Sequence, residues 1–284
     1  MRADRPSHTA QRVALSRAAH QLYDRPKILE DPIALRIIGT QSEQEVRAHR
    51  QRFDTRFARH LRAFLVARSR LAEDALGAAV ARGVGQYVIL GAGLDTFAYR
   101  NPYPAARLRV FEVDHPATQA WKRRQLSAAD IGVPPSLTLV PVDFETERLA
   151  DALRGAGLRT AQPAFFSWLG VTMYLTRAAV LATLEFVAGA NARGSGIVFD
   201  YVTSLEGLSF TRRLLARALL RRVAALGEPW QSCFDPRALA GELRALGFTQ
   251  TEDFGPAELN ARFFSERHDR LRVAGPGRVL SAQL

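Results

Sequence analysis

Apolar residues recur every three or four positions through the first 80 residues, and short apolar runs take their place further along the chain. The first pattern predicts helices, because residues with that spacing lie on one face of a helix. Asp31 followed by Pro32 is a typical helix start, and Gly83 is a typical helix end. We therefore predict helices over residues 10–22, 31–38 and 43–80.

From residue 83 onwards, short apolar runs alternate with helical stretches. The predicted strands are 86–91, 108–114, 137–142, 163–168, 196–202 and 247–253, with a last one near 277–283. The predicted helices between them are 116–128, 146–155, 176–191, 207–226 and 235–246. This alternation is typical of a mostly parallel sheet with helices on both faces. The predicted fold class is therefore α/β, of the Rossmann-like kind.

The sequence contains no internal repeat, linker or low-complexity tract. We expect a single domain over 1–284, in which 1–82 forms a helical cap and 83–284 a Rossmann-like core. Segment 203–234 is longer than a plain connection, so we predict that it adds a helical lid. Its helix 207–226 is a candidate lid or homodimer surface.

The net charge of +11 comes from 39 basic residues spread along the chain, of which only Lys27 and Lys122 are lysines. Arginines at helical spacing are typical of a solvated helix face, so we expect no nucleic-acid partner. The charge would still attract an anionic substrate. No apolar stretch reaches the roughly 18 residues that span a bilayer, and no signal-peptide pattern is present, so we expect a cytoplasmic protein without a membrane partner. The single cysteine and the histidine spacing predict no metal site.

The clearest chemical signal is an apolar strand, Val88-Ile-Leu, that runs into the loop Gly-Ala-Gly-Leu-Asp-Thr96. In open parallel sheets, ligands bind outside the carboxyl ends of the strands. Glycine there lets the backbone approach a ligand, so Gly91, Ala92 and Gly93 are candidate cofactor-binding residues. A dinucleotide fingerprint would need a third glycine in place of Thr96, which disfavours a nicotinamide oxidoreductase.

Acidic residues end the next two predicted strands. Nucleoside-binding sheets place an acid for the ribose hydroxyls about twenty residues beyond the glycine loop. Asp114 is the first candidate there and Glu112 the second, since a carboxylate accepts hydrogen bonds from both hydroxyls. After the third strand, Asp143 and Phe144 are candidates to accept from an adenine amino group and to stack on the base.

These segments resemble the leucine carboxyl methyltransferase family, and most closely its bacterial small-molecule branch. The resemblance runs from about Ala14 to Phe264 and rests on VILGAGLDTFAYR, VFEVDHPATQAWKRRQL, VPVDFE and SWLGVTMYLT. It implies a class I methyltransferase fold, a helical cap over the cofactor, and S-adenosylmethionine (AdoMet) as that cofactor.

The resemblance also implies roles for individual residues of this chain. It assigns the glycine loop, the ribose contact and the adenine contact to the residues already named: Gly91, Ala92, Gly93, Asp114, Asp143 and Phe144. It matches Arg68 with an arginine that holds the AdoMet carboxylate, a contact that suits the guanidinium fork. Arg62 and Arg70 are nearby alternatives.

One position departs from the family pattern. Where the family commonly has a glutamate near the methionine end of AdoMet, this chain has Leu169. The corresponding contact must then come from backbone carbonyls or from another acid. Trp168, Tyr174 and Tyr23 are candidate residues of the substrate site.

The favoured function is an AdoMet-dependent O-methyltransferase of specialised metabolism that acts on a small-molecule carboxylate or hydroxyl. A carboxylate acceptor needs no general base, and the sequence offers no persuasive histidine–acid pair. Two other functions stay open. The first is a protein C-terminal carboxyl methyltransferase, which needs a groove for a peptide. The second is a degenerate AdoMet-fold binding protein, which the departure at Leu169 keeps in view.

Overall fold

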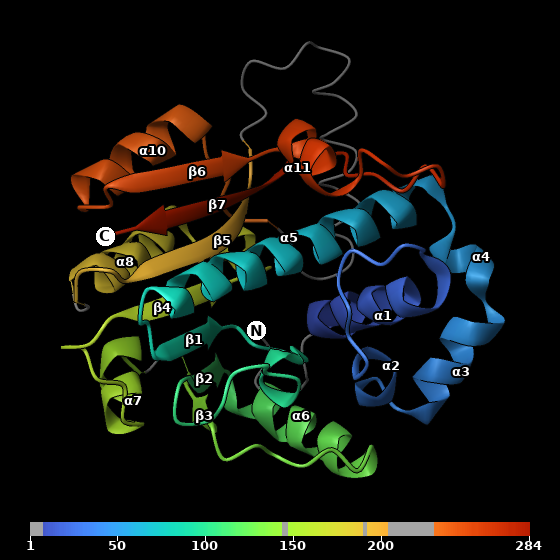
Figure 1. The fold of residues 1–284 in the computed structure, drawn as a ribbon, viewed down its shortest axis with the longest axis horizontal. Coiled ribbons are helices and arrows are strands. Elements are labelled where there is room, and N and C mark those ends of the chain that lie inside the picture. The colour runs from blue at the N-terminus through green and yellow to red at the C-terminus, as the bar shows by residue number, and fades with distance from the viewer. Residues whose placement is uncertain (1–7, 144–146, 190–191, 204–229) are drawn as a thin grey trace.

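The computed structural model describes residues 8–143, 147–189, 192–203 and 230–284. Its centre is a seven-stranded sheet with the strand order β3-β2-β1-β4-β5-β7-β6 (Figure 1). The strands are β1 (Gln86–Leu90), β2 (Arg109–Asp114), β3 (Leu137–Pro141), β4 (Ala164–Trp168), β5 (Gly196–Val202), β6 (Gln250–Phe254) and β7 (Gly277–Gln283). Neighbouring strands run parallel except at β7, which is antiparallel to both β5 and β6. The predicted α/β class and mostly parallel sheet are confirmed.

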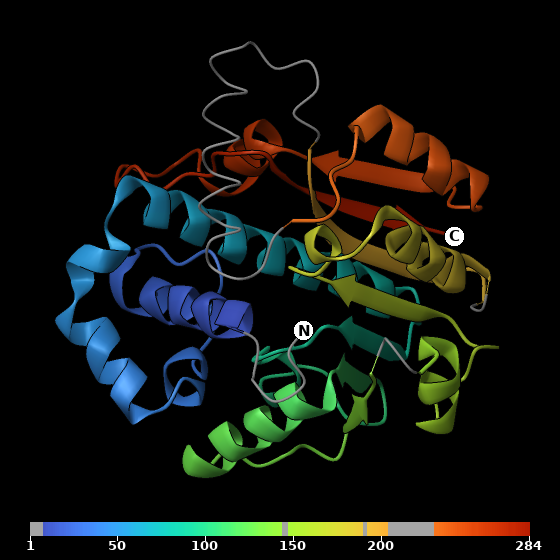
Figure 2. The same cartoon turned by 180° about the vertical axis from the view of Figure 1, so that it is seen from behind.

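Helices cover both faces of this sheet, as expected for strands β1, β4 and β5 that are buried along their whole length. The described helices are α1 (His8–Tyr23), α2 (Ala34–Ile37), α3 (Thr40–Ala48), α4 (Arg50–Phe53), α5 (Arg56–Ala81), α6 (Pro116–Ala128), α7 (Leu149–Gly155), α8 (Arg177–Gly189), α10 (Pro236–Ala245) and α11 (Pro256–Phe263), with short 3-10 helices η1 (Phe97–Tyr99) and η2 (Thr172–Tyr174). Helix α5 crosses one face (Figure 1), while α7, α8 and α10 lie over the other (Figure 2).

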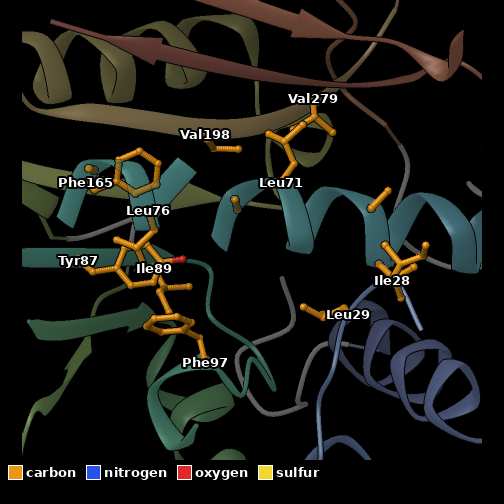
Figure 3. Close-up of a cluster of buried hydrophobic side chains, with 14 of the residues drawn as sticks. Ile28, Leu29, Leu71, Leu76, Tyr87, Ile89, Phe97, Phe165, Val198 and Val279 are labelled. Carbon is orange, nitrogen blue, oxygen red and sulfur yellow. The ribbon is translucent and has the colours of Figure 1, made fainter. Parts of the chain in front are cut away.

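The largest hydrophobic cluster lies between α5 and the sheet (Figure 3). Leu71 and Leu76 of α5 pack there with Ile89 of β1 and Val198 of β5. Ile28, from the loop after α1, belongs to the same cluster. The N-terminal helices and the sheet therefore share one core, and α5 is held firmly across the strands.

The prediction of one helix over 43–80 is wrong, because the chain forms α3, α4 and α5 there. The main break falls at Asp54 and Thr55. The Ala58 N–H donates to Thr55 Oγ1 at 3.2 Å, which caps the first turn of α5. This short polar signal sits between two helical patterns that are both rich in arginine, so periodicity alone joined them.

Other predicted elements met different outcomes. The predicted helix 207–226, and most of the predicted lid 203–234, lie outside the described residues. The sequence did not predict α11, although Gly255, Pro256 and Glu258 form a capping signal at its start. Within the described ranges, no helix is long and apolar enough to cross a membrane.

Candidate cofactor site at the strand ends

Asp114, Gly91, Leu169 and Asp200 lie in one row at or near the carboxyl ends of four neighbouring strands. The strand register aligns the residues that come just before them, namely Val113, Leu90, Trp168 and Phe199. Those four belong to the core on the face opposite α5. Because side chains alternate along a strand, the row itself points to the face that α5 covers. We call these four residues the strand-end row.

The glycine loop is tied back to the neighbouring strand. The N–H groups of Gly91 and Ala92 donate to the Val113 carbonyl at 2.8 and 3.1 Å. Gly91 and Gly93 have positive φ angles of 66° and 49°, a conformation that favours glycine. A Cβ atom on Gly91 would also overlap the side chain of Val171. The loop therefore needs glycine at position 91 both for its backbone conformation and for its close packing against Val171.

Asp114 lies against this loop. Its Oδ2 accepts from Gly93 N–H at 2.6 Å and its Oδ1 from His115 N–H at 2.7 Å. Burial raises the pKa of this carboxyl, and the two backbone hydrogen bonds only partly offset that rise. Each carboxylate oxygen still has a free lone pair. Thr118 of α6 also interacts with this carboxyl. Asp114 keeps accepting capacity for a ligand beyond these contacts.

Glu112 is placed differently from Asp114, although both point to the same face. It is fully buried two residues deeper in β2, and Lys122 Nζ of α6 lies 2.6 Å from its Oε2. Burial raises its pKa, and Lys122 opposes that rise. Because its partner is internal, Glu112 is less well placed than Asp114 to contact a ligand.

Asp143 follows β3 beside the end of β2. The preceding Val142 N–H donates to the Asp114 carbonyl at 3.0 Å, which brings the two acids to the same edge of the sheet. Asp143 N–H donates to Glu147 Oε2 at 2.8 Å. Phe144 lies outside the described residues.

Of the three candidate arginines on α5, only Arg68 reaches the strand-end row. Its Nη1 lies 2.5 Å from Asp200 Oδ2, and the Arg68 side chain is 6% exposed. Arg62 pairs instead with Asp24 at 2.7 Å, and the more exposed Arg70 pairs with Asp74. Sequence reasoning missed Asp200, although an acid near the end of a predicted strand was the signal already used for Asp114.

The remaining candidates are not brought together. Leu169 packs against the core cluster under α5. Trp168 is buried in the opposite core, so it does not face the strand-end row. Tyr23 donates its hydroxyl hydrogen bond to the Val46 carbonyl inside the cap. Tyr174 belongs to η2, in the loop that follows Leu169, and stays a candidate for the substrate site.

Helix α1 lies against the glycine loop from outside. Arg17 Nη2 donates to the Leu94 carbonyl at 3.2 Å and to Thr96 Oγ1 at 2.8 Å. Thr96 in turn donates to Asp31 Oδ2 at 2.7 Å. Asp95, rather than Thr96, accepts from the first N–H of η1. The residue that breaks the dinucleotide fingerprint thus anchors the cap.

The structure also contains a histidine–acid pair that the sequence did not reveal. His20 Nδ1 lies 2.8 Å from Asp24 Oδ2, and its Nε2 accepts from Ile28 N–H at 3.0 Å. His20 is fully buried. Both ring nitrogens are used inside the cap, so this pair serves the structure of the cap.

Known proteins resemble this chain in sequence. Residues 10–188 match the family model described as leucine carboxyl methyltransferase. The chain is also 33% identical, over 95% of both chains, to YktD of Bacillus subtilis (strain 168), which carries the name of an S-adenosyl-L-methionine-dependent methyltransferase. The chain belongs to the leucine carboxyl methyltransferase family.

Solved structures that resemble this leucine carboxyl methyltransferase family member show the same fold. A DUF574 family protein from Streptomyces avermitilis covers 98% of the chain with a TM-score of 0.54 and 16% identity, and 97% of its own chain is covered. A protein from Thermobifida fusca that is named as a methyltransferase covers 98% of the chain with a TM-score of 0.53 and 16% identity, and 95% of its own chain is covered. Together they identify the fold as that of class I methyltransferases. The matched family segment contains Arg68, Asp114 and Asp143, whereas Asp200 lies beyond it.

Proposed function

We propose that this chain is an O-methyltransferase that transfers a methyl group from AdoMet to a small-molecule acceptor, with a carboxylate as the favoured acceptor. Dependence on AdoMet is the coarser part and follows from family membership. The acceptor class is the finer part of the proposal. The observation that supports the cofactor part is that the glycine loop, Asp114 and Arg68 converge on one row at the strand ends.

The residues in this row fit the parts of AdoMet. Asp114 keeps accepting capacity for the ribose hydroxyls beyond its two backbone hydrogen bonds. The glycine loop has no side chain to block the approach of a ligand to its backbone. Arg68 Nε is buried and has no hydrogen-bond partner among the described residues, so one donor of the guanidinium is available for the carboxylate of the amino-acid end.

Bound AdoMet supplies a methyl group on an electrophilic sulfonium, so the protein's task is mainly to position a nucleophile. In this proposal, Asp114 and Arg68 fix the two ends of the cofactor. A carboxylate acceptor is already ionised at neutral pH and needs no base. His20 is buried with both ring nitrogens engaged, and His115 caps α6 through Nδ1, so neither is well placed as a general base, which favours a carboxylate acceptor.

The cofactor part is tested by isothermal titration with AdoMet and, separately, with NADH. We expect AdoMet to bind and NADH not to bind. Arg68→Ala and Asp114→Ala should each weaken AdoMet binding by at least about tenfold, since each removes a charged hydrogen-bond partner. Arg70→Ala, on the same helix but paired with Asp74, is the matched control and should bind normally. A folded wild-type protein that does not bind AdoMet would refute the proposal.

The acceptor part is tested by incubating the protein with methyl-labelled AdoMet and panels of small carboxylic acids and alcohols. Methyl esters release labelled methanol in mild base, whereas methyl ethers do not. We expect base-labile label from an acid of the panel. Label that survives base would move the acceptor from a carboxylate to a hydroxyl or to another atom.

A further inference from the structure

Arg68 and Asp200 form a buried ion pair at the β5 end of the strand-end row. Arg68 Nη1 lies 2.5 Å from Asp200 Oδ2, and the side chain of Asp200 is fully buried. The two residues are 132 positions apart in sequence and come from α5 and β5. An unpaired charge at such depth would be very unfavourable, so each residue depends on the other for its place.

Asp200 also holds the loop that follows β4. Its Oδ1 accepts from Gly170 N–H at 2.5 Å. Gly170 has a φ of 78°, and a Cβ atom there would lie 2.8 Å from Arg68 Nη2. The guanidinium of Arg68 is thus confined between the Asp200 carboxylate and the backbone of Gly170. One carboxylate fixes both the arginine and the loop beside it.

This arrangement leaves a specific donor free. Arg68 Nε is buried and has no hydrogen-bond partner among the described residues. Leu169, next to Gly170, contributes only an apolar side chain to the same row. A ligand carboxylate that reached Arg68 would satisfy the free donor, and its geometry would be set by how Asp200 holds the guanidinium.

We propose that Asp200 is a positioning residue that aims Arg68 at the amino-acid end of the cofactor and thereby sets how strongly the site distinguishes ligands that carry this end. This inference rests on the proposed function. It goes beyond the proposed function by assigning the discrimination between ligands to Asp200, which does not itself contact the ligand.

The test compares two ligands that differ only in the amino-acid end. S-adenosylhomocysteine carries that end, and 5′-methylthioadenosine lacks it. Isothermal titration of the full chain should show that wild type prefers S-adenosylhomocysteine. Asp200→Asn should weaken S-adenosylhomocysteine binding by at least about tenfold while leaving 5′-methylthioadenosine binding within about twofold. Asp253→Asn is the matched control, since Asp253 pairs with Arg278 at 3.0 Å two strands away, and it should keep the wild-type preference.

A double variant tests whether Asp200 acts through Arg68. Arg68→Gln alone should also abolish the preference, and Arg68→Gln with Asp200→Asn should be no worse than Arg68→Gln alone, because both changes remove one interaction. The double variant also lacks both buried charges, so it keeps the test informative if Asp200→Asn folds poorly.

Three results with the variants, and two with the wild type, would overturn the inference. Asp200→Asn could keep the preference, it could lose both ligands equally, or the double variant could be weaker than Arg68→Gln. A wild type that binds both ligands equally well would overturn the inference while leaving nucleoside binding intact. A wild type that binds neither ligand would overturn the proposed function as well.

Discussion

Gly91 occupies a position where any other residue meets two obstacles. Its φ is 66°, and a Cβ atom would overlap Val171 in the loop after β4. Gly91→Ala should therefore lower the free energy of unfolding by about 1–3 kcal/mol. Gly241 is the matched control, because it lies inside α10 with no atom within 4 Å of its Cβ position. Gly241→Ala should raise the free energy of unfolding by about 0.5–1 kcal/mol.

Urea denaturation of the two variants measures both effects. Opposite signs would show that the glycine loop is held by conformation and close packing rather than by composition. Equal stability of Gly91→Ala and wild type would mean that Val171 moves away at little cost.

The raised pKa of Asp114 predicts that ligand affinity depends on pH. Burial raises its pKa above the ordinary 3.8, and backbone hydrogen bonds from Gly93 and His115 oppose the rise. In the proposed site, ribose hydroxyls would donate to the ionised carboxylate of Asp114, so a proton on this carboxyl would compete with the ligand. The affinity for S-adenosylhomocysteine should therefore fall as pH is lowered, beginning above 3.8.

Isothermal titration between neutral and mildly acidic pH measures this fall. Asp114→Asn should bind more weakly at neutral pH and show a flatter profile. Parallel profiles for the two proteins would place the titrating group elsewhere.

Strand-end reasoning found Asp114 but not Asp200, and the reason is physical. The predicted strand 108–114 ended at its acid, whereas Tyr201 and Val202 carry β5 two residues past Asp200. These extra residues pair with Arg278 and Gly277 of β7. A contact such as that between Arg68 and Asp200 depends on how α5 crosses the sheet, which residue spacing does not contain.

Among the elements, α1 and α5 are joined through Asp24. Its carboxylate accepts from Arg62 at 2.7 and 2.9 Å and lies 2.8 Å from His20 Nδ1. Burial alone would raise the pKa of Asp24, but the hydrogen bonds from His20 and Arg62 outweigh it and lower the pKa to about 2. The ionised carboxylate is therefore part of what holds the cap together.

The pH dependence of stability follows from this depressed pKa. Relative to an ordinary value of 3.8, the shift to about 2 corresponds to about 2 kcal/mol of stabilisation. That stabilisation is complete above about pH 5 and is lost as pH falls towards 2. Asp24→Asn should cost at least about 2 kcal/mol at pH 7, and the difference from wild type should shrink below about pH 5.

Urea denaturation of wild type and Asp24→Asn at pH 7, 5 and about 3.5 tests this linkage. Asp74→Asn serves as the comparison, since its pairs with Arg70 and Arg262 are partly exposed. It should change stability by no more than about 1 kcal/mol at any of these pH values. A cost for Asp24→Asn that stays constant with pH would show that the charge of Asp24 is not what stabilises the cap.

Element boundaries were predicted where a change of pattern marked them. The glycines after residue 81 ended α5 as expected, and Gly83 has a φ of 100°. The start of α5 was missed because Thr55 is one polar residue within a continuous helical pattern. Helix α11 has only eight residues, too few for periodicity to stand out from its polar neighbours.

The whole molecule is organised around α5. This helix packs on the central strands in the shared core (Figure 3). Its Arg62 pairs with Asp24 just after α1, and its Arg68 reaches the strand-end row. The family resemblance predicted the fold and the cofactor because its motifs lie at strand ends, where the sheet fixes their geometry. It did not predict how α5 links the end of α1 to the strand-end row.

The net charge of +11 acts at this scale too. Many described arginines already pair with carboxylates of the same chain: Arg17, Arg47, Arg59, Arg62, Arg68, Arg70, Arg100, Arg154, Arg177, Arg262, Arg267 and Arg278. Paired guanidinium groups have fewer donors left for phosphates. The excess charge should therefore attract polyanions at long range but form few direct hydrogen bonds with them.

From this charge distribution we predict weak, salt-sensitive association with nucleic acid. Fluorescence anisotropy with a labelled DNA duplex should show binding at about 20 mM salt and none at about 200 mM, because counterion release drives such binding. Binding of S-adenosylhomocysteine should persist at both salt concentrations, since the proposed contacts with part-buried Asp114 and buried Arg68 would be little screened. Tight DNA binding at the higher salt, above all if it depended on base sequence, would contradict the prediction and make nucleic acid a genuine partner of this methyltransferase.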